Sequence, residues 1–149
     1  MIDKRKIFNK INESLDEKIH LLNEIIKETK LSRDNDTKSS AGDKYETGRE
    51  MMQAEIIKTE VQLSNILDQK KDLAQINLEK RSKKVEFGSL VETNNGNYFF
   101  SIAFGKIEIE GVTCYSISLA SPFGQMMNNK VVGDNYNFNG KQFVINNIE

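Results

Sequence analysis

Acidic side chains gather in one short polar stretch of the chain. Asp34, Asp36 and Asp43 lie within residues 33–50, which lack the apolar side chains needed to bury such a segment. Acids in this setting have two ordinary uses: they stabilise the positive end of a helix, or they act on something outside the chain. Both uses require that the stretch be a turn between structured elements, so the flanking segments decide its role.

A local, purely structural explanation exists for part of this stretch. Residues 40–43 fit the S-x-x-D pattern of a capping box, which predicts a helix start there. Asp43 and Glu46 would then lie near the positive end of the following helix. Acids at a helix start are more often caps than catalysts, and this interpretation stays open beside the functional one.

Two long segments with helical apolar spacing flank the turn. In residues 3–31 the apolar positions recur at intervals of three and four, without Pro or Gly. They are Phe8, Ile11, Leu15, Ile19, Leu22 and Ile26. In residues 44–79 the corresponding positions are Met52, Ile56, Leu63, Ile66, Leu73 and Ile76, with Thr59 and Lys70 weakening the stripe.

A long helix with one narrow apolar stripe needs a partner along its length. The two segments have similar lengths and a short connection, which predicts an antiparallel coiled-coil hairpin over residues 1–80 with its tip at about 33–45. Two helices of a compact bundle are the alternative, but no third helical segment completes one. The hairpin would hold its acids away from the rest of the protein, a geometry suited to reaching into a deep site.

The composition changes near residue 84 from Lys, Glu, Ile and Leu to Gly, Asn, Val and aromatic residues. Residues 81–87 form a basic linker, whose cations we expect to complement the end of the second helix. Residues 88–149 show period-two patterns and turn signals, including Asn95-Gly96 and Asn139-Gly140. We therefore expect an α+β protein, with a small antiparallel sheet and one short helix after Pro122.

Composition excludes several classes of function. Neither half is basic enough for autonomous nucleic-acid binding. Cys114 and His20 are the only residues of their types, which excludes a Cys/His zinc site, and we expect a core cysteine and a surface histidine. The chain has no Gly-rich phosphate loop, no apolar run long enough to span a membrane and no signal-peptide pattern, so we expect a cytoplasmic protein without an active site of its own.

The carboxyl half contains an ordered series of motifs. These are Ser121-Pro122, a short helical segment over 124–129, Lys130-Val-Val-Gly-Asp134, and a hairpin over 135–148. Their order and spacing resemble the end of bacterial transcript-cleavage factors of the GreA/GreB type. The long hairpin and its acidic tip extend the resemblance over essentially the whole chain.

This resemblance implies a coiled-coil finger followed by an FKBP-like domain that docks on RNA polymerase core, with no membrane partner. The finger would enter the secondary channel of the polymerase, and the factor would contact nascent RNA indirectly and act as a monomer. Tip acids, here Asp36, Asp43 and more weakly Asp34, would help to hold a Mg²⁺ ion shared with the polymerase, which then cuts backtracked RNA. Docking candidates are Ser121, Pro122, Phe123, Met126, Lys130, Gly133 and Asp134.

The tip departs from the family pattern at the second acid. Asp36 matches the first acid and Ala41 matches an alanine, but Ser39 stands where the second acid should be. Asp43 could replace it if the longer loop folds back. A channel-binding modulator or inhibitor that does not stimulate cleavage is therefore a second interpretation.

Two further interpretations belong to other classes of protein. A coiled-coil interaction protein that dimerises through its helices is one, and Thr59 and Lys70 argue mildly against its long apolar seam. A prolyl isomerase is the other, but it needs an aromatic-lined pocket, and we expect the aromatic side chains to form the core and a docking surface. For Met126 and Met127 we expect one buried and one partly exposed side chain.

Overall fold

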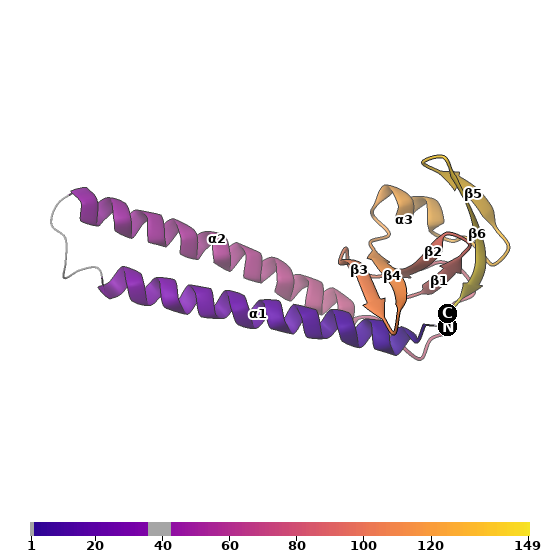
Figure 1. The fold of residues 1–149 in the computed structure, drawn as a ribbon, viewed down its shortest axis with the longest axis horizontal. Helices are drawn as coiled ribbons and strands as arrows, with labels where there is room; N and C mark the ends of the chain where they lie inside the picture. The colour runs from indigo at the N-terminus through magenta and orange to yellow at the C-terminus, as the bar shows by residue number, and fades with distance from the viewer. Residues whose placement is uncertain (1, 36–42) are drawn as a thin grey trace. The chain divides into compact units, whose positions relative to one another are not determined.

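The computed structural model describes residues 2–35 and 43–149 and, within the second helix, side chains from Glu46 onward. It is α+β, as predicted: two long helices precede six strands and a short helix (Figure 1). The helices are α1 (Lys4–Asn35), α2 (Asp43–Ala74) and α3 (Pro122–Met127). The strands are β1 (Leu90–Thr93), β2 (Gly96–Phe100), β3 (Gly105–Ile109), β4 (Val112–Ile117), β5 (Asn135–Phe138) and β6 (Lys141–Ile148).

The chain forms two compact units that do not follow the expected division at residues 80 and 88. Residues 14–70 form one unit, and residues 1–13 together with 71–149 form the other. The composition shift near residue 84 does not mark this division, because α2 already ends at Ala74. Residues 81–87, expected as a linker, contribute the fully buried Val85, whose N–H donates to the carbonyl of Lys130 at 2.8 Å.

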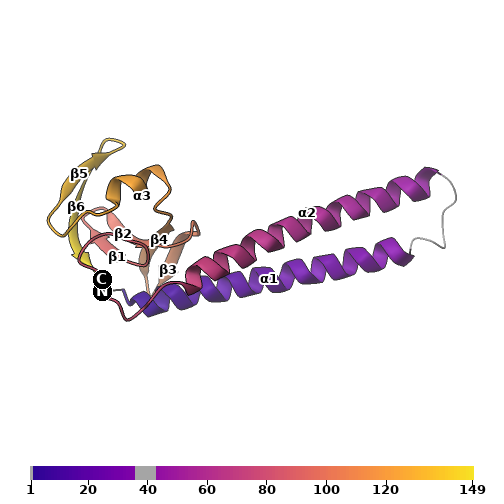
Figure 2. The same ribbon diagram turned by 180° about the vertical axis from the view of Figure 1, so that it is seen from behind.

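In the helical unit α1 and α2 lie side by side and run in opposite directions (Figures 1 and 2). The predicted stripes are only partly enclosed: Leu15, Ile26 and Ile56 are buried, and the other apolar stripe residues between 14 and 70 are half-buried. Ion pairs flank the stripe, from Lys70 to Asp16 and from Lys30 to Glu60, the latter at 3.7 Å.

The two polar residues on the stripe of α2 are each satisfied locally. Thr59 is 3% exposed, and its hydroxyl donates to the carbonyl of Glu55 at 2.8 Å, one turn earlier in the same helix. The Lys70 ammonium pairs with the carboxylate of Asp16 at the edge of the stripe. The hairpin therefore accepts Thr59 and Lys70 with the polar groups of both side chains paired.

In the other unit the six strands form one sheet in the order β3-β4-β2-β1-β6-β5. The sheet is mostly antiparallel, as predicted, and differs at one place, where β2 and β4 are parallel, with Phe99 opposite Ser116. The reason is that β3 turns back as a hairpin outside β4, which brings β4 beside β2 in the same direction. Central strands β1 and β2 thus have partners on both sides, whereas β3 and β5 are edges.

The predicted turns occur with one change of position. Asn139-Gly140 joins β5 to β6, and both residues have positive φ, 50° and 78°, as a two-residue hairpin loop of the I′ type requires. The loop between β1 and β2 is Asn94-Asn95 instead of Asn95-Gly96, since Gly96 already pairs with Thr93. Gly96 still supplies the left-handed conformation there, with φ of 128°.

An aromatic cluster fills the space between the sheet and α3. The ring of Phe123 packs against Tyr98 at 4.8 Å between centroids and against Phe138 and Phe143, each at 5.3 Å. Met127 is fully buried and Met126 half-buried, as predicted. The aromatic residues thus form a packed core.

The start of α1 belongs to this unit through a buried lysine. Lys4 is 3% exposed, and its ammonium donates to the carbonyls of Lys80 and Glu149 at 3.2 and 3.3 Å. Burial lowers the pKa of Lys4, and the charge of Glu149 opposes that shift. A lysine in the first helical turn gives no sequence signal that distinguishes it from a solvated one.

The predicted role of the basic segment after α2 was wrong. Because α2 ends at Ala74, Lys80 lies beyond the reach of the helix dipole. Lys80 instead pairs with Glu86 at 2.7 Å, and Ser82 donates to the same carboxylate at 2.9 Å. These hydrogen bonds lower the pKa of Glu86.

The tight contact below α3 predicts that Gly124→Ala destabilises the protein by about 2–3 kcal/mol. A Cβ atom at Gly124 would lie 2.2 Å from the carbonyl oxygen of Ser118 and 2.6 Å from the Cα of Leu119, and backbone atoms cannot move aside cheaply. Urea unfolding measures the loss. The control Gln125→Ala, on the exposed side of the same helix, should cost less than about 1 kcal/mol; equal losses would contradict the packing argument.

Burial of Cys114 predicts a pH dependence of stability. Burial raises the pKa of its thiol from 9.0 to about 12, so the unfolded chain loses this proton at lower pH than the folded protein does. The stabilising contribution of the buried thiol to the free energy of unfolding is complete below pH 9.0. It is lost as the pH rises, by about 1.4 kcal/mol per pH unit until about pH 12. Urea denaturation at several pH values across this window should show that the free energy of unfolding declines less steeply for Cys114→Ala than for the wild type. Both proteins have the same tyrosines, so parallel declines would refute the assignment to Cys114.

Candidate functional site

The three candidate acids fall around the point where the two long helices are joined. Asp34 is the next-to-last residue of α1, and Asp43 is the first residue of α2. Asp36 and the predicted capping pattern over 40–42 lie outside the described residues, as does Ser39. The backbone thus places Asp34 and Asp43 at the facing ends of a helical hairpin, while the side chain of Asp34 is the one of the three that is described.

Arg33 controls the surroundings of Asp34. Its Nε donates to Oδ1 of Asp34 at 3.0 Å, and its Nη1 donates to Oε1 of Gln53 on α2 at 2.6 Å. The Arg33 side chain is 20% exposed, whereas that of Asp34 is 58% exposed. One guanidinium therefore links the end of α1 to α2 and offsets the charge of the adjacent carboxylate.

A shallow hollow of about 270 Å³ lies at this end of the hairpin. Its lining mixes two cations and two anions: Arg33, Arg49, Glu46, Glu50 and Gln53. Because the formal charges of these five residues cancel, the hollow attracts neither phosphate nor a metal ion strongly by itself.

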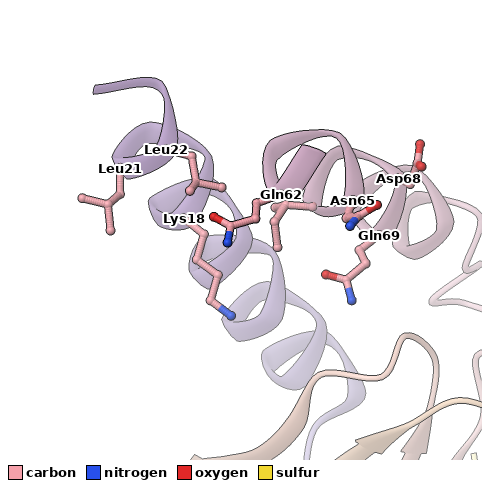
Figure 3. A pocket seen from close by; sticks show the side chains of 8 residues that line it. Lys18, Leu21, Leu22, Gln62, Asn65, Asp68 and Gln69 are labelled. Atoms are coloured by element: carbon pink, nitrogen blue, oxygen red, sulfur yellow. The ribbon is translucent and has the colours of Figure 1, made fainter. Parts of the chain in front are cut away.

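A second, larger hollow of about 460 Å³ lies between α1 and α2 nearer the middle of the helical unit. Leu21, Leu22 and Lys18 line it from α1, and Gln62, Asn65, Asp68 and Gln69 lie across from them on α2 (Figure 3). Leu21 is 59% exposed. Leu22 and Ile66, which belong to the predicted stripes, also line the hollow and are half-buried, so the helices do not close over the stripes at this place.

Several of the predicted docking residues have a structural role in the sheet unit. Ser121 caps α3, since its hydroxyl accepts from the N–H of Gly124 at 3.0 Å, and Pro122 occupies the first turn. The ring of Phe123 is 8% exposed within the core, which leaves little of it for contact with another molecule. Pro122 is exposed and Met126 is half-buried, so these two retain accessible surface.

The motif over residues 130–134 forms a tight turn before β5. The carboxylate of Asp134 accepts from the N–H of Val131 at 2.9 Å, and Gly133 has φ of 91°. The side chains of Val131 and Val132 are 45% and 54% exposed. Lys130 is half-buried and Gly133 is exposed, so the accessible part of this turn consists of Gly133 and the apolar pair Val131 and Val132, which was not predicted as a docking surface.

Other candidate sites receive little support from the described part of the chain. Within residues 2–35 and 43–149 no three His, Cys, Asp or Glu side chains come together as metal ligands would. His20 is exposed on α1 and Cys114 is buried, both as predicted. None of the described helices is long and apolar enough to cross a lipid bilayer.

The link between Arg33 and Gln53 was not predicted, because both residues are polar and the helix stripes were defined by apolar residues. The spacing signal for Arg33 was present, since Ile26, the half-buried Thr29 and Arg33 continue the three-and-four pattern of α1. The stripe of α1 therefore ends at Ile26 when it is defined by apolar residues alone. A long side chain such as that of Arg33 can also occupy a stripe position, because its aliphatic part packs in the seam while its charged group reaches the solvent.

Comparison with known proteins does not assign the chain to a family. No protein-family model matches the sequence, and no curated protein matches it significantly.

The bridge from Arg33 to Gln53 predicts that Arg33→Met loosens the acidic end of the hairpin. We expect faster amide hydrogen exchange at the end of α1 and in the first turns of α2, and a loss of at most about 1 kcal/mol in overall stability, because the bond is partly exposed. Lys30→Met, which removes the longer ion pair to Glu60, is the matched control and should change exchange less. Equal effects would show that Arg33 is not the principal link.

Proposed function

We propose that this protein is an RNA polymerase-binding elongation factor that supports transcript cleavage by the polymerase in backtracked complexes. The observation that carries the proposal is the helical hairpin itself, whose two helices of 32 residues each meet next to a group of acids. The ordered motifs from Ser121 to Asp134, with their resemblance to GreA/GreB-type factors, support the same function. The protein would have no catalytic centre of its own.

The dimensions of the hairpin suit this task. A helix of 32 residues is about 48 Å long at 1.5 Å per residue. Such a pair can carry carboxylates deep into a channel of another protein, because it is narrow. Its outer faces mix charged side chains with exposed apolar ones, Met51, Ile57 and Val61 among them. A loop of the same length would lose much more conformational entropy when held in place.

The acids at the joined helix ends supply the chemistry that this function needs. Carboxylates are suitable ligands for Mg²⁺, which usually takes one or two from protein and keeps several waters. A Mg²⁺ ion shared with the polymerase would activate water and stabilise the leaving oxygen. Since Arg33 already engages Asp34, we assign the ligand role to Asp36 and Asp43.

A channel-binding modulator that slows synthesis without supporting cleavage is the second candidate. Two observations favour it: Ser39 stands where GreA/GreB-type factors have their second acid, and Asp34 is ion-paired. With one fewer carboxylate available, the factor would occupy the channel but bind the ion weakly. The two candidates share the partner and differ in the effect on RNA.

The first test is binding. RNA polymerase core should retain the full-length protein in a pull-down at micromolar concentration, and failure to bind would overturn both candidates. Binding should be assayed with the wild type, Pro122→Ala and Met126→Ala, since these side chains keep accessible surface in the predicted docking region.

The second test is RNA cleavage in stalled, backtracked complexes with Mg²⁺. Asp36→Asn and Asp43→Asn should each lower the cleavage rate by about 10–100-fold at limiting Mg²⁺, with part of the loss restored by excess Mg²⁺. Asp68→Asn on α2, outside the acidic stretch, is the matched control and should leave the rate unchanged.

The result also separates the two candidate functions. Unchanged RNA length together with slower elongation would establish the modulator. Cleavage that survives both acid substitutions would show that the ligand assignment is wrong.

A further inference from the structure

We propose that Asn139 is a site of spontaneous deamidation in the folded protein, whereas Asn95, the other asparagine that precedes glycine, is protected by the sheet. The proposal depends on the different places of the two Asn-Gly pairs in the fold. It is independent of the proposed function in transcription.

The reaction needs water and no enzyme. The backbone nitrogen of the glycine attacks Cγ of the preceding asparagine side chain, forming a C–N bond and giving its proton to solvent as ammonia leaves. Water then opens the cyclic imide at either carbonyl, which yields aspartate or isoaspartate. Glycine favours this attack because it has no Cβ to hinder the approach and leaves the backbone free to rotate.

Asn139 and Gly140 lie where the backbone can open at low cost. They are the two loop residues between β5 and β6, outside the ladder that ends at the pair Phe138 and Lys141. Asn139 is exposed, and among the described residues its side chain makes no hydrogen bond. Nothing lies within 4 Å of a Cβ built on Gly140, so the surroundings do not hold the loop.

The position of β5 at the edge of the sheet further lowers the free energy needed to open the loop at Asn139 and Gly140. β5 has four residues and is an edge strand, paired with β6 alone. The I′ loop fixes Asn139 at φ of 50°, so the attack requires the loop to leave its folded conformation. A short edge hairpin frays more readily than central strands do, so this opening is frequent.

Asn95 and Gly96 are held by their neighbours. Gly96 is a strand residue paired with Thr93, so its nitrogen belongs to the hairpin ladder. The side-chain amide of Asn95 donates to the carbonyl of Gln142 at 2.5 Å, which fixes the group that would be attacked. The hydroxyl of Tyr98 donates to the carbonyl of Asn95 at 3.3 Å.

The strands on either side of Asn95 also resist opening. β1 pairs with both β2 and β6, and β2 pairs with both β1 and β4. Releasing this turn therefore disturbs two central strands, whereas releasing Asn139 disturbs one edge hairpin. The sheet itself should separate the rates of two chemically identical sites.

Conversion at Asn139 would change the hairpin as well as its charge. Isoaspartate adds one backbone carbon to a loop of two residues, whose geometry requires positive φ at both positions. The pairing of Phe138 with Lys141 would then be strained. The product is an acid beside Lys141 at the outer end of the sheet.

The test is peptide mapping by mass spectrometry after prolonged incubation in mildly alkaline buffer, with the intact protein compared with the same chain in concentrated urea. Urea removes the sheet, so both asparagines should convert at similar rates there. In the folded protein Asn139 should convert at least about tenfold faster than Asn95, because opening the central turn breaks more hydrogen bonds.

Two results would overturn the proposal: equal rates in the folded protein, or an unconverted Asn139 after a time sufficient for conversion in urea. The variant Asn95→Asp is a second check that does not depend on rates. It removes the donor to Gln142 and should lower stability, whereas Asn139→Asp should leave the free energy of unfolding within about 0.5 kcal/mol of the wild type.

Discussion

The structure of the helical unit depends on the burial of two narrow apolar stripes against each other. Neither α1 nor α2 could be stable alone, because helices in water gain most of their stability from an apolar face that is packed. The stripes are not continuous, and Thr59 and Lys70 interrupt the one on α2. Each interruption is satisfied nearby, Thr59 by the carbonyl of Glu55 and Lys70 by Asp16, so pairing continues through both.

At the acidic end of the hairpin, electrostatics replaces apolar packing. Beyond Ile26 the seam continues with Thr29 and Arg33, and the guanidinium of Arg33 takes over the linking role. The same group pairs with Asp34, so the residue that joins the helices also engages one of the three candidate acids. Structural support and the number of available carboxylates are therefore coupled in one side chain.

The helices, the fold class and most strands could be predicted because their signals are local. Apolar spacing predicted α1 and α2, and the turn signal Asn139-Gly140 predicted the hairpin of β5 and β6. The parallel pairing of β2 with β4 could not be predicted from local patterns, because it depends on which strand returns beside which. The burial of Lys4 depends likewise on carbonyls of Lys80 and Glu149, far away in the sequence.

The site was predictable to a lesser degree than the fold. Residue types located the acids at the joined ends of the helices, but charge alone could not show that Arg33 engages Asp34. In the sheet unit, the order of motifs from Ser121 to Asp134 could be read from the sequence. Their separate roles, with Ser121 as a helix cap, Phe123 in the core and Asp134 in a turn, became clear only from the structure. Polar residues with structural tasks look the same in a sequence as polar residues with functional ones.

The pairing of β1 with β6 has a consequence for synthesis on the ribosome. Contacts near the joined ends of α1 and α2, such as that of Arg33 with Gln53, are close in sequence and can form early, whereas the central strand β1 waits for a partner that is made more than forty residues later. Until β6 emerges, β1 presents unpaired backbone groups to its surroundings. Nascent chains therefore carry an open template for intermolecular association during that interval, and protection at this stage would have to come from chaperones or from rapid translation of the last strands.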